Sequence, residues 1–327
     1  MNRPAPFRLA LISDIHYAGA AEAARQPAMF DPISSPLRRQ LVRLYRRHLW
    51  LHDPCAHNHL LDRFLSQTAD ADLVVANGDF SCDSACIGVS DDAACASATE
   101  CLAKLRATFP GRFHATFGDH ELGKKMLAAN VGGLRLASYH RAEQELGLQP
   151  FWQWTVGRYV LMGIVSTLVA LPVYEAEALA EEKAAWRKLR AAHLEQIRAA
   201  FAALQPDQRV LLFCHDPTAL PFLAREDAVR AKLPQIERTI IGHLHSPLIL
   251  RQSALLSGLP AVPFLGHTIR RVTAALHEAR HWHRFNILLC PSPAGIQLRK
   301  DGGYYTAEID PAARQPARFL FHPLGWS

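Results

Sequence analysis

The chain has 327 residues, of which 49% are hydrophobic and 9% aromatic, with only 18 glycines. These proportions exclude a disordered or fibrous protein, and no apolar run reaches the roughly 18 to 20 residues of a membrane span. A net charge of +6 favours anionic partners, although it does not distinguish phosphate esters, nucleic acid and an anionic membrane surface.

The first six residues lead directly into an apolar strand, without the long apolar core of a signal peptide. The chain has seven cysteines, an odd number, with Cys214 inside one predicted strand and Cys290 at the end of another, which is typical of reduced thiols. Both features predict a cytoplasmic protein. Four cysteines cluster after residue 79 without the paired spacing of a zinc knuckle, so we interpret them as packed thiols, with Cys82 and Cys86 close to the position of Asp79.

A first strand is predicted over residues 8–14, and the next strand does not begin until about residue 72. This interval exceeds an ordinary connection with one helix, so we expect a helical insertion over residues 30–65. Residues 36–50 within it predict a basic amphipathic helix, whose apolar face carries Leu37, Leu41, Leu44, Tyr45 and Leu49. Two interpretations stay open. The helix either docks on the core, or it forms a cap or membrane-surface element that engages an anionic or lipidic substrate.

The later elements are predicted from apolar periodicity and turn residues. Helices are expected over residues 60–68, 93–108, 134–148 and 175–204, and strands over 73–75, 113–116, 151–155, 159–166, 210–213 and 239–241. Short strands follow over 261–265 and 284–289, with a hairpin formed by 295–300 and 304–309. Several polar residues are interpreted as capping or surface groups: His57, Asn58, His59, His193, His277, His281 and His283. No repeat or linker divides the chain, so we predict one domain over residues 1–327.

Five predicted strands end in residues that bind metals. These are Asp14 and His16, then Asp79, then Asp119 with His120 and Glu121, then His215, and finally His243 with His245. Open α/β sheets bind ligands beyond the carboxyl ends of their strands, and oxygen and nitrogen ligands at five such ends predict a two-metal site. The alternative, that strand-end carboxylates only cap the following helices, is disfavoured because all the partners are present together.

The order of these motifs resembles that of the calcineurin-like metallophosphoesterases, over residues 8–267. The matching segments are Asp14-Ile15-His16, Gly78-Asp79, Gly118-Asp119-His120-Glu121, His215 and Gly242-His243-Leu244-His245. The resemblance implies an α/β fold, a four-layer αββα sandwich with two mixed sheets flanked by helices, whose second sheet contains the short C-terminal strands. Asp119 departs from the family pattern, which usually has Asn at this position.

The resemblance also implies a role for each motif. Asp79 would be shared by two divalent metal ions. Asp14, His16 and His245 would complete the first metal site, and Asp119, His215 and His243 the second. His120 would protonate the leaving oxygen or bind the phosphoryl oxygen, with Glu121 orienting its ring. Manganese is favoured, with iron or zinc as alternatives. Asp119 adds a third carboxylate, so we expect a less acidified bridging water and a more tightly held second ion, or a protonated Asp119.

The function so implied is hydrolysis of a phosphodiester, pyrophosphate or phosphomonoester through a metal-bridging hydroxide. One alternative is an enzyme similar to the UDP-diacylglucosamine pyrophosphatases of lipid A synthesis, which would place the protein peripherally at the inner membrane surface through residues 36–50, with a nucleotide-lipid substrate. Cyclic nucleotides and phosphoproteins are further substrate classes. A non-catalytic scaffold is disfavoured by the intact ligand set, and a nucleic-acid partner by the lack of a basic stripe interleaved with aromatic residues.

Overall fold

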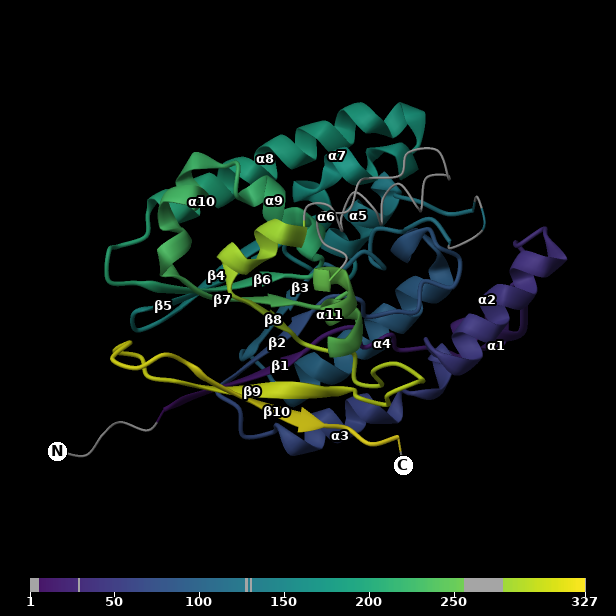
Figure 1. Ribbon diagram of the computed structural model, residues 1–327, viewed down its shortest axis with the longest axis horizontal. Coiled ribbons are helices and arrows are strands. Elements are labelled where there is room, and N and C mark those ends of the chain that lie inside the picture. The colour runs from purple at the N-terminus through teal and green to yellow at the C-terminus, as the bar shows by residue number, and fades with distance from the viewer. Residues whose placement is uncertain (1–5, 29, 127–128, 130, 256–278, 327) are drawn as a thin grey trace.

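The computed structural model of the protein describes residues 6–28, 30–126, 129, 131–255 and 279–326, and consists of two β-sheets face to face between layers of helices (Figure 1). The first sheet has the strand order β10-β9-β1-β2-β3, and the second β4-β5-β6-β7-β8. The first contains β1 (Phe7–Ile12), β2 (Leu73–Asn77), β3 (Phe113–Thr116), β9 (Gly303–Ile309) and β10 (Arg318–Pro323). The second contains β4 (Phe151–Val156), β5 (Tyr159–Ile164), β6 (Arg209–Cys214), β7 (Ile236–Ile241) and β8 (Ile287–Leu289). The predicted fold class is confirmed.

Both sheets are mixed, with parallel pairs that include the motif-bearing strands. β1, β2 and β3 pair in parallel, as do β5, β6, β7 and β8, whereas β4, β9 and β10 join by antiparallel pairs. Parallel strands release their following loops at the same edge of a sheet. The motif-bearing loops of each sheet therefore leave it at a single edge.

The layer between the sheets is built from alternate residues of the strands. Leu9 and Leu11 of β1 pack in one cluster with Leu211 and Phe213 of β6, while the intervening Ala10 belongs to a second cluster with the outer helices. Successive side chains of a strand point to opposite faces, so each central strand is apolar on both faces. This explains why the strands appear in the sequence as continuous apolar runs.

Helices cover the outer face of each sheet. α3 (His59–Gln67) and α4 (Asp92–Thr108) flank the first sheet, and α8 (Lys183–Ala202) lies over the second with α9 (Leu220–Leu223) and α10 (Asp227–Lys232) (Figure 1). The other helices are α1 (Ala20–Arg25), α2 (Pro36–His48), α5 (Leu136–Gln144), α6 (Ser166–Val169), α7 (Leu171–Tyr174) and α11 (Pro247–Leu255). Within the described ranges, no helix is both long enough and apolar enough to cross a membrane.

Helix α2 projects from the body of the protein (Figure 1). It begins with a Ser35 cap, whose side chain accepts a hydrogen bond from Arg38 N, and with Pro36 in its first turn. Its apolar face is not docked on the core: Leu37 is 71% exposed, Leu41 57% and Leu44 45%. The interpretation of α2 as a helix packed on the core is therefore wrong, and the predicted insertion divides into a projecting α2 and a packed α3.

The long helix predicted over residues 175–204 begins only at Lys183. The acidic residues before it form two short 3-10 turns, separated by extended backbone at Ala178. Their carboxylates bind other segments instead: Glu177 accepts a hydrogen bond from Lys125 N, and Glu182 accepts one from Leu136 N. These long-range bonds outweigh the helical propensity of the acidic stretch.

The predicted C-terminal hairpin is also wrong. Residues 295–300 form a turn rather than a strand, and β9 pairs with β1 and with β10, a strand that the sequence analysis missed. Of the C-terminal strands, only β8 joins the second sheet, while β9 and β10 extend the first. The strand predicted over residues 261–265 lies outside the described residues.

His193 was predicted to be exposed, but its side chain is buried on the inner face of α8. Its Nε2 accepts a hydrogen bond from Val165 N at 3.1 Å. Burial lowers the pKa of His193 from an ordinary 6.5 to about 4. Since an uncharged imidazole is needed to accept this bond, protonation opposes the folded state.

The pH dependence of stability is expected to reflect His193. Because the folded-state pKa of His193 is depressed, its contribution to the free energy of unfolding is fully present above pH 6.5. This contribution is lost as the pH falls from about 6.5 to about 4, and the loss reaches about 2 kcal/mol at pH 5. A His193→Gln variant keeps an acceptor for Val165 N but cannot titrate. Urea unfolding at pH 7.5 and 5.0 should show a smaller loss for this variant than for the parent, whereas His59→Gln, at an exposed position, should behave as the parent. Equal losses in all three proteins would contradict the assignment.

Candidate metal centre

The predicted ligands meet at the edge where the two sheets release their parallel strands. Asp14 follows β1, Asp79 follows β2, Asp119 follows β3, His215 follows β6, and His243 follows β7. All of these side chains are buried except that of His243, which is partly exposed. The loops after β1 and β2 continue the pairing of their strands, because Asp14 N donates to Gly78 O and His16 N to Asp79 O.

The backbone at these positions adopts a conformation that L-residues rarely take. Asp14, His16, Asp79, His243 and His245 all have φ between 49° and 61°. Left-handed backbone at non-glycine residues costs on the order of 1 kcal/mol or more, and such residues concentrate at functional sites. Tight packing enforces the loop path, since a Cβ at Gly118 would lie 2.1 Å from Asp79 Oδ1.

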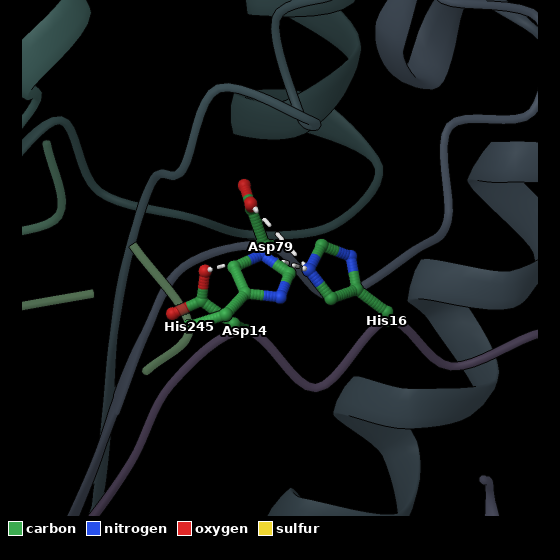
Figure 2. Close-up of side chains that lie close together, drawn as sticks. All are labelled: Asp14, His16, Asp79 and His245. Atoms are coloured by element: carbon green, nitrogen blue, oxygen red, sulfur yellow. Dashed lines mark hydrogen bonds and ion pairs between the residues drawn. The ribbon is translucent and has the colours of Figure 1, made fainter. Parts of the chain in front are cut away.

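A first cluster brings together Asp14, His16, Asp79 and His245 (Figure 2). His16 Nε2 lies 3.2 Å from His245 Nε2, and His245 Nε2 lies 3.4 Å from Asp14 Oδ1. His16 Nε2 is 3.9 Å from Asp79 Oδ2. Two imidazole nitrogens and two carboxylates thus point at a common centre, as metal ligands do.

A second cluster lies beside the first and contains Asp119, His215 and His243. Asp119 Oδ1 is 3.1 Å from His243 Nδ1 and 3.4 Å from His215 Nε2. His215 Nε2 is also 3.2 Å from Asp79 Oδ2, and Asp79 forms a further group with Asp119 and His120. Asp79 therefore stands between the two clusters, where a carboxylate shared by two ions would be placed.

Backbone carbonyls fix the histidine rings. His16 Nδ1 and His120 Nδ1 both face Ser81 O, at 3.2 and 3.1 Å, and His215 Nδ1 faces Asn77 O at 2.6 Å. Because a carbonyl only accepts hydrogen bonds, each Nδ1 donates and each Nε2 is turned away from that carbonyl. In a neutral ring Nε2 then has the lone pair that a metal ion needs, and in a protonated ring it can donate a hydrogen bond. Sequence analysis missed the contribution of Ser81, since it comes from a backbone atom that carries no side-chain signal.

Glu121 differs from its expected role. Its buried carboxylate accepts hydrogen bonds from Gly118 N, Asp79 N and Phe80 N, and the partner that orients the ring of His120 is Ser81 O. Glu121 thereby ties the loop after β2 to the loop after β3. Burial raises the pKa of Glu121 to about 7, with Asp79 adding to the shift.

The donor set fits divalent metal ions. Asp79 Oδ2 and His215 Nε2 are buried, and neither has a hydrogen-bond partner of acceptable geometry among the described residues. Buried polar atoms without partners are costly, and carboxylate oxygens with imidazole nitrogens suit manganese, iron or zinc. Burial alone lowers the pKa of His215, but Asp79 and Asp14 outweigh it and hold that pKa well above its ordinary value. The local field therefore strongly favours positive charge at this position.

A pocket of about 370 Å³ opens directly onto the clusters and is lined by His16, His120, His243 and His245 on one side. The insertion contributes a largely apolar part of the lining, with Phe30, Ile33, Val42, Tyr45, Trp50 and Leu51. The Trp50 ring lies 4.7 Å from that of His245, centroid to centroid. Cys82 and Cys86 also line the pocket, together with Cys55, and all seven thiols are free.

The remaining polar residues singled out in the sequence lie apart from the clusters. The His57 ring packs against Trp326, and the Asn58 side chain pairs with the backbone of Ala18. His59 and His283 are exposed. His277 and the side chain of His281 lie outside the described residues.

The calcineurin-like phosphoesterase family model matches residues 7–247. No curated protein matches the chain. Among solved structures, the chain is similar to a crystal structure of a dimetal phosphatase from Danio rerio, with 13% identity and a TM-score of 0.49, over 99% of this chain and 100% of that chain.

Metal uptake is expected to depend on Asp79. Because Asp79 lies between the two clusters, Asp79→Ala should lose most of the roughly two equivalents of divalent ion expected for the parent. Elemental analysis after loading with manganese and desalting measures this. Asp207→Ala, at an exposed carboxylate before β6, should bind as much metal as the parent. Full metal content in Asp79→Ala would contradict the shared-ligand assignment.

Proposed function

The chain belongs to the calcineurin-like phosphoesterase family and is a hydrolase of phosphoric esters, and on this premise we propose that it is a single-domain enzyme that cleaves phosphodiesters, pyrophosphates or phosphomonoesters with two bound divalent ions. The observation that carries the proposal is the pair of ligand clusters joined by Asp79. We propose Asp14, His16 and His245 as further ligands of the first ion. Asp119, His215 and His243 would hold the second.

Two bound divalent ions neutralise phosphoryl oxygens and lower the pKa of a bound water, which is the chemistry that phosphoester hydrolysis needs. The chain itself holds the ligands in place. Ser81 O and Asn77 O fix the imidazole rings, and Glu121 fixes the loops that carry Asp79 and Asp119. This prior arrangement supports catalysis because little reorganisation is left for the reaction.

His120 is the proposed group for contact with the leaving oxygen or the phosphoryl oxygen. It lines the pocket, its Nδ1 faces Ser81 O, and its Nε2 lies 3.8 Å from Asp79 Oδ2. Such a ring can present Nε2 to a substrate held at the clusters. A group that exchanges a proton in the transition state typically contributes 10²- to 10⁴-fold to the rate.

The proposal is tested by hydrolysis of bis-p-nitrophenyl phosphate and p-nitrophenyl phosphate by metal-stripped protein, supplied in turn with manganese, zinc and magnesium. Turnover should require metal, with manganese proposed as the most effective ion, and should vanish in Asp79→Ala. His120→Gln should keep its metal content and lose about 100-fold or more in kcat.

Two results would count against this reading. Loss of metal from His120→Gln would make His120 a ligand rather than a contact to substrate. A parent protein that takes up no metal would favour the non-catalytic scaffold.

A second candidate concerns the substrate. We propose that the pocket accepts a phosphoester with an apolar group, and that residues 30–51 form the cap that receives it. Apolar residues of this segment line the same pocket as the ligand histidines, and Trp50 contacts His245. Two backbone bonds, Gln297 N to Trp50 O and Leu298 N to Leu49 O, hold the base of the cap on the body. A nucleotide-lipid, as in the UDP-diacylglucosamine pyrophosphatase alternative, has this character.

The exposed surface of helix α2 also supports a substrate with an apolar group. Leu37, Leu41 and Leu44 are exposed, and a second hollow of about 320 Å³ is lined by Arg43, Arg46 and Arg47 among others. An apolar face beside a cluster of arginines is typical of helices that lie on anionic membrane surfaces. We therefore propose peripheral membrane contact through α2.

Binding to vesicles tests this contact. The parent should co-sediment with phosphatidylglycerol vesicles, and Leu37→Gln/Leu41→Gln/Leu44→Gln should lose most of that binding, since glutamine preserves helical propensity while removing the apolar face. Leu320→Gln, at a residue of β10 that is 53% exposed, is the matched control and should bind as the parent.

The substrate itself is tested by chain length. Hexyl p-nitrophenyl phosphate should be cleaved with a kcat/KM at least about tenfold above that of the methyl ester, because each buried methylene contributes roughly 0.8 kcal/mol. Equal values of kcat/KM for the two esters would contradict the proposed apolar subsite. A chain-length effect without vesicle binding would favour a soluble amphiphile over a membrane lipid.

A further inference from the structure

The metal centre holds three buried carboxylates, and one of them has a lysine at contact distance. Lys124 Nζ lies 2.8 Å from Asp119 Oδ2, while Asp119 Oδ1 faces His243 and His215. The carboxylate is therefore divided, with one oxygen turned to the ligand cluster and the other to an ammonium group. The side chain of Asp119 is 3% exposed and that of Lys124 27%.

The backbone places Lys124 at this position. Leu122 N and Gly123 N both donate to Asp119 O, which closes a tight turn immediately before Lys124. Gly123 has φ +89°, and a Cβ there would lie 2.5 Å from Gly133 O. On the other side, Lys125 N donates to Glu177. With the chain fixed before and after it, Lys124 is held over the carboxylate five residues earlier.

An oxygen ligand that carries a full charge attracts a dication more strongly than a neutral one, and also reduces the positive charge available to polarise substrate and water. A lysine in contact with the outer oxygen offsets that charge without occupying the inner oxygen. Among the described residues, Asp83 and Glu22 also line the pocket that Lys124 lines, and both are buried. Asp119 is the one whose carboxylate lies against both the ammonium group and the ligand cluster.

We propose that Lys124 is a charge-compensating, positioning residue of the second cluster, so that Asp119 and Lys124 together act as a ligand with little net charge. This inference rests on the proposed two-metal function and concerns the affinity and the electrostatics of the second ion. Lys124 acts through Asp119.

A double-mutant cycle tests the pair. The parent, Lys124→Met, Asp119→Asn and Asp119→Asn/Lys124→Met are compared in the affinity of the second manganese equivalent, measured by competition with a chelator, and in the Tm of the metal-free proteins. Lys124→Met exposes the cluster to an uncompensated carboxylate, so it should bind the second ion roughly tenfold more tightly and melt at a lower temperature when metal-free. Asp119→Asn leaves an uncompensated ammonium group and should bind the second ion at least roughly tenfold more weakly. The double variant should return to within about threefold of the parent.

Two further variants separate the pair from general effects. Lys124→Arg keeps the charge and should restore parental affinity, whereas Lys125→Met removes a neighbouring charge that also lines the pocket and should change affinity by less than about threefold. The proposal is overturned if Lys124→Met has the same effect in the parent and in the Asp119→Asn background, or if Lys125→Met reproduces it. If the parent protein binds one ion but no second, the proposed role of the Asp119–Lys124 pair is contradicted and the proposed hydrolytic function is not. If the parent binds no ion at all, both proposals are contradicted.

Discussion

Three carboxylates, those of Asp14, Asp79 and Asp119, are buried together, and the structure must hold them in place against their mutual repulsion. The fold does this by joining two sheets through one apolar layer, in which Leu11 of β1 and Phe213 of β6 belong to the same cluster. Since the motif-bearing strands are parallel, their carboxyl ends are fixed beside one another before any side chain of the site is considered. His215, His243 and Lys124 lie against these carboxylates and supply the positive charge that they need from the protein itself.

The same constraint explains why the loops are so rigidly tied. A cluster of metal ligands functions only if the ligands stay close together. Here hydrogen bonds to backbone atoms keep the ligands from moving apart. Ser81 O holds two imidazole rings, and Glu121 holds three backbone N–H groups from the loops after β2 and β3. The left-handed residues Asp14 and Asp79 are sustained by this network.

The fold class was predictable from the sequence because the central strands are apolar on both faces and each ends in a polar motif. Such a local pattern predicts the structure directly, as where the apolar residues Ile240–Ile241 end strand β7 just before Gly242. Where long-range bonds decide the structure, prediction failed: Glu177 and Glu182 leave the predicted helix to bind Lys125 N and Leu136 N. The contacts of Ser81, Trp50 and Lys124 were missed for a related reason, since a backbone carbonyl, a ring at the end of an exposed helix and a lysine carry no ligand pattern.

Helix α2 connects the environment of the protein to the metal centre. A helix of 13 residues is marginal in water by itself, and α2 buries none of its side chains. Its order therefore depends on contacts with other segments. Arg39 donates to Ile33 O and Arg43 lies over the Phe30 ring, while beyond its C-terminal end the backbone bonds to residues 297–298 and the contact of Trp50 with His245 hold the chain. A surface that covered Leu37 and Leu41 would stabilise the helix as a whole and, through Trp50, the ring of His245 in the first ligand cluster. Such a link would act in both directions, because a coupling free energy between two sites is reciprocal.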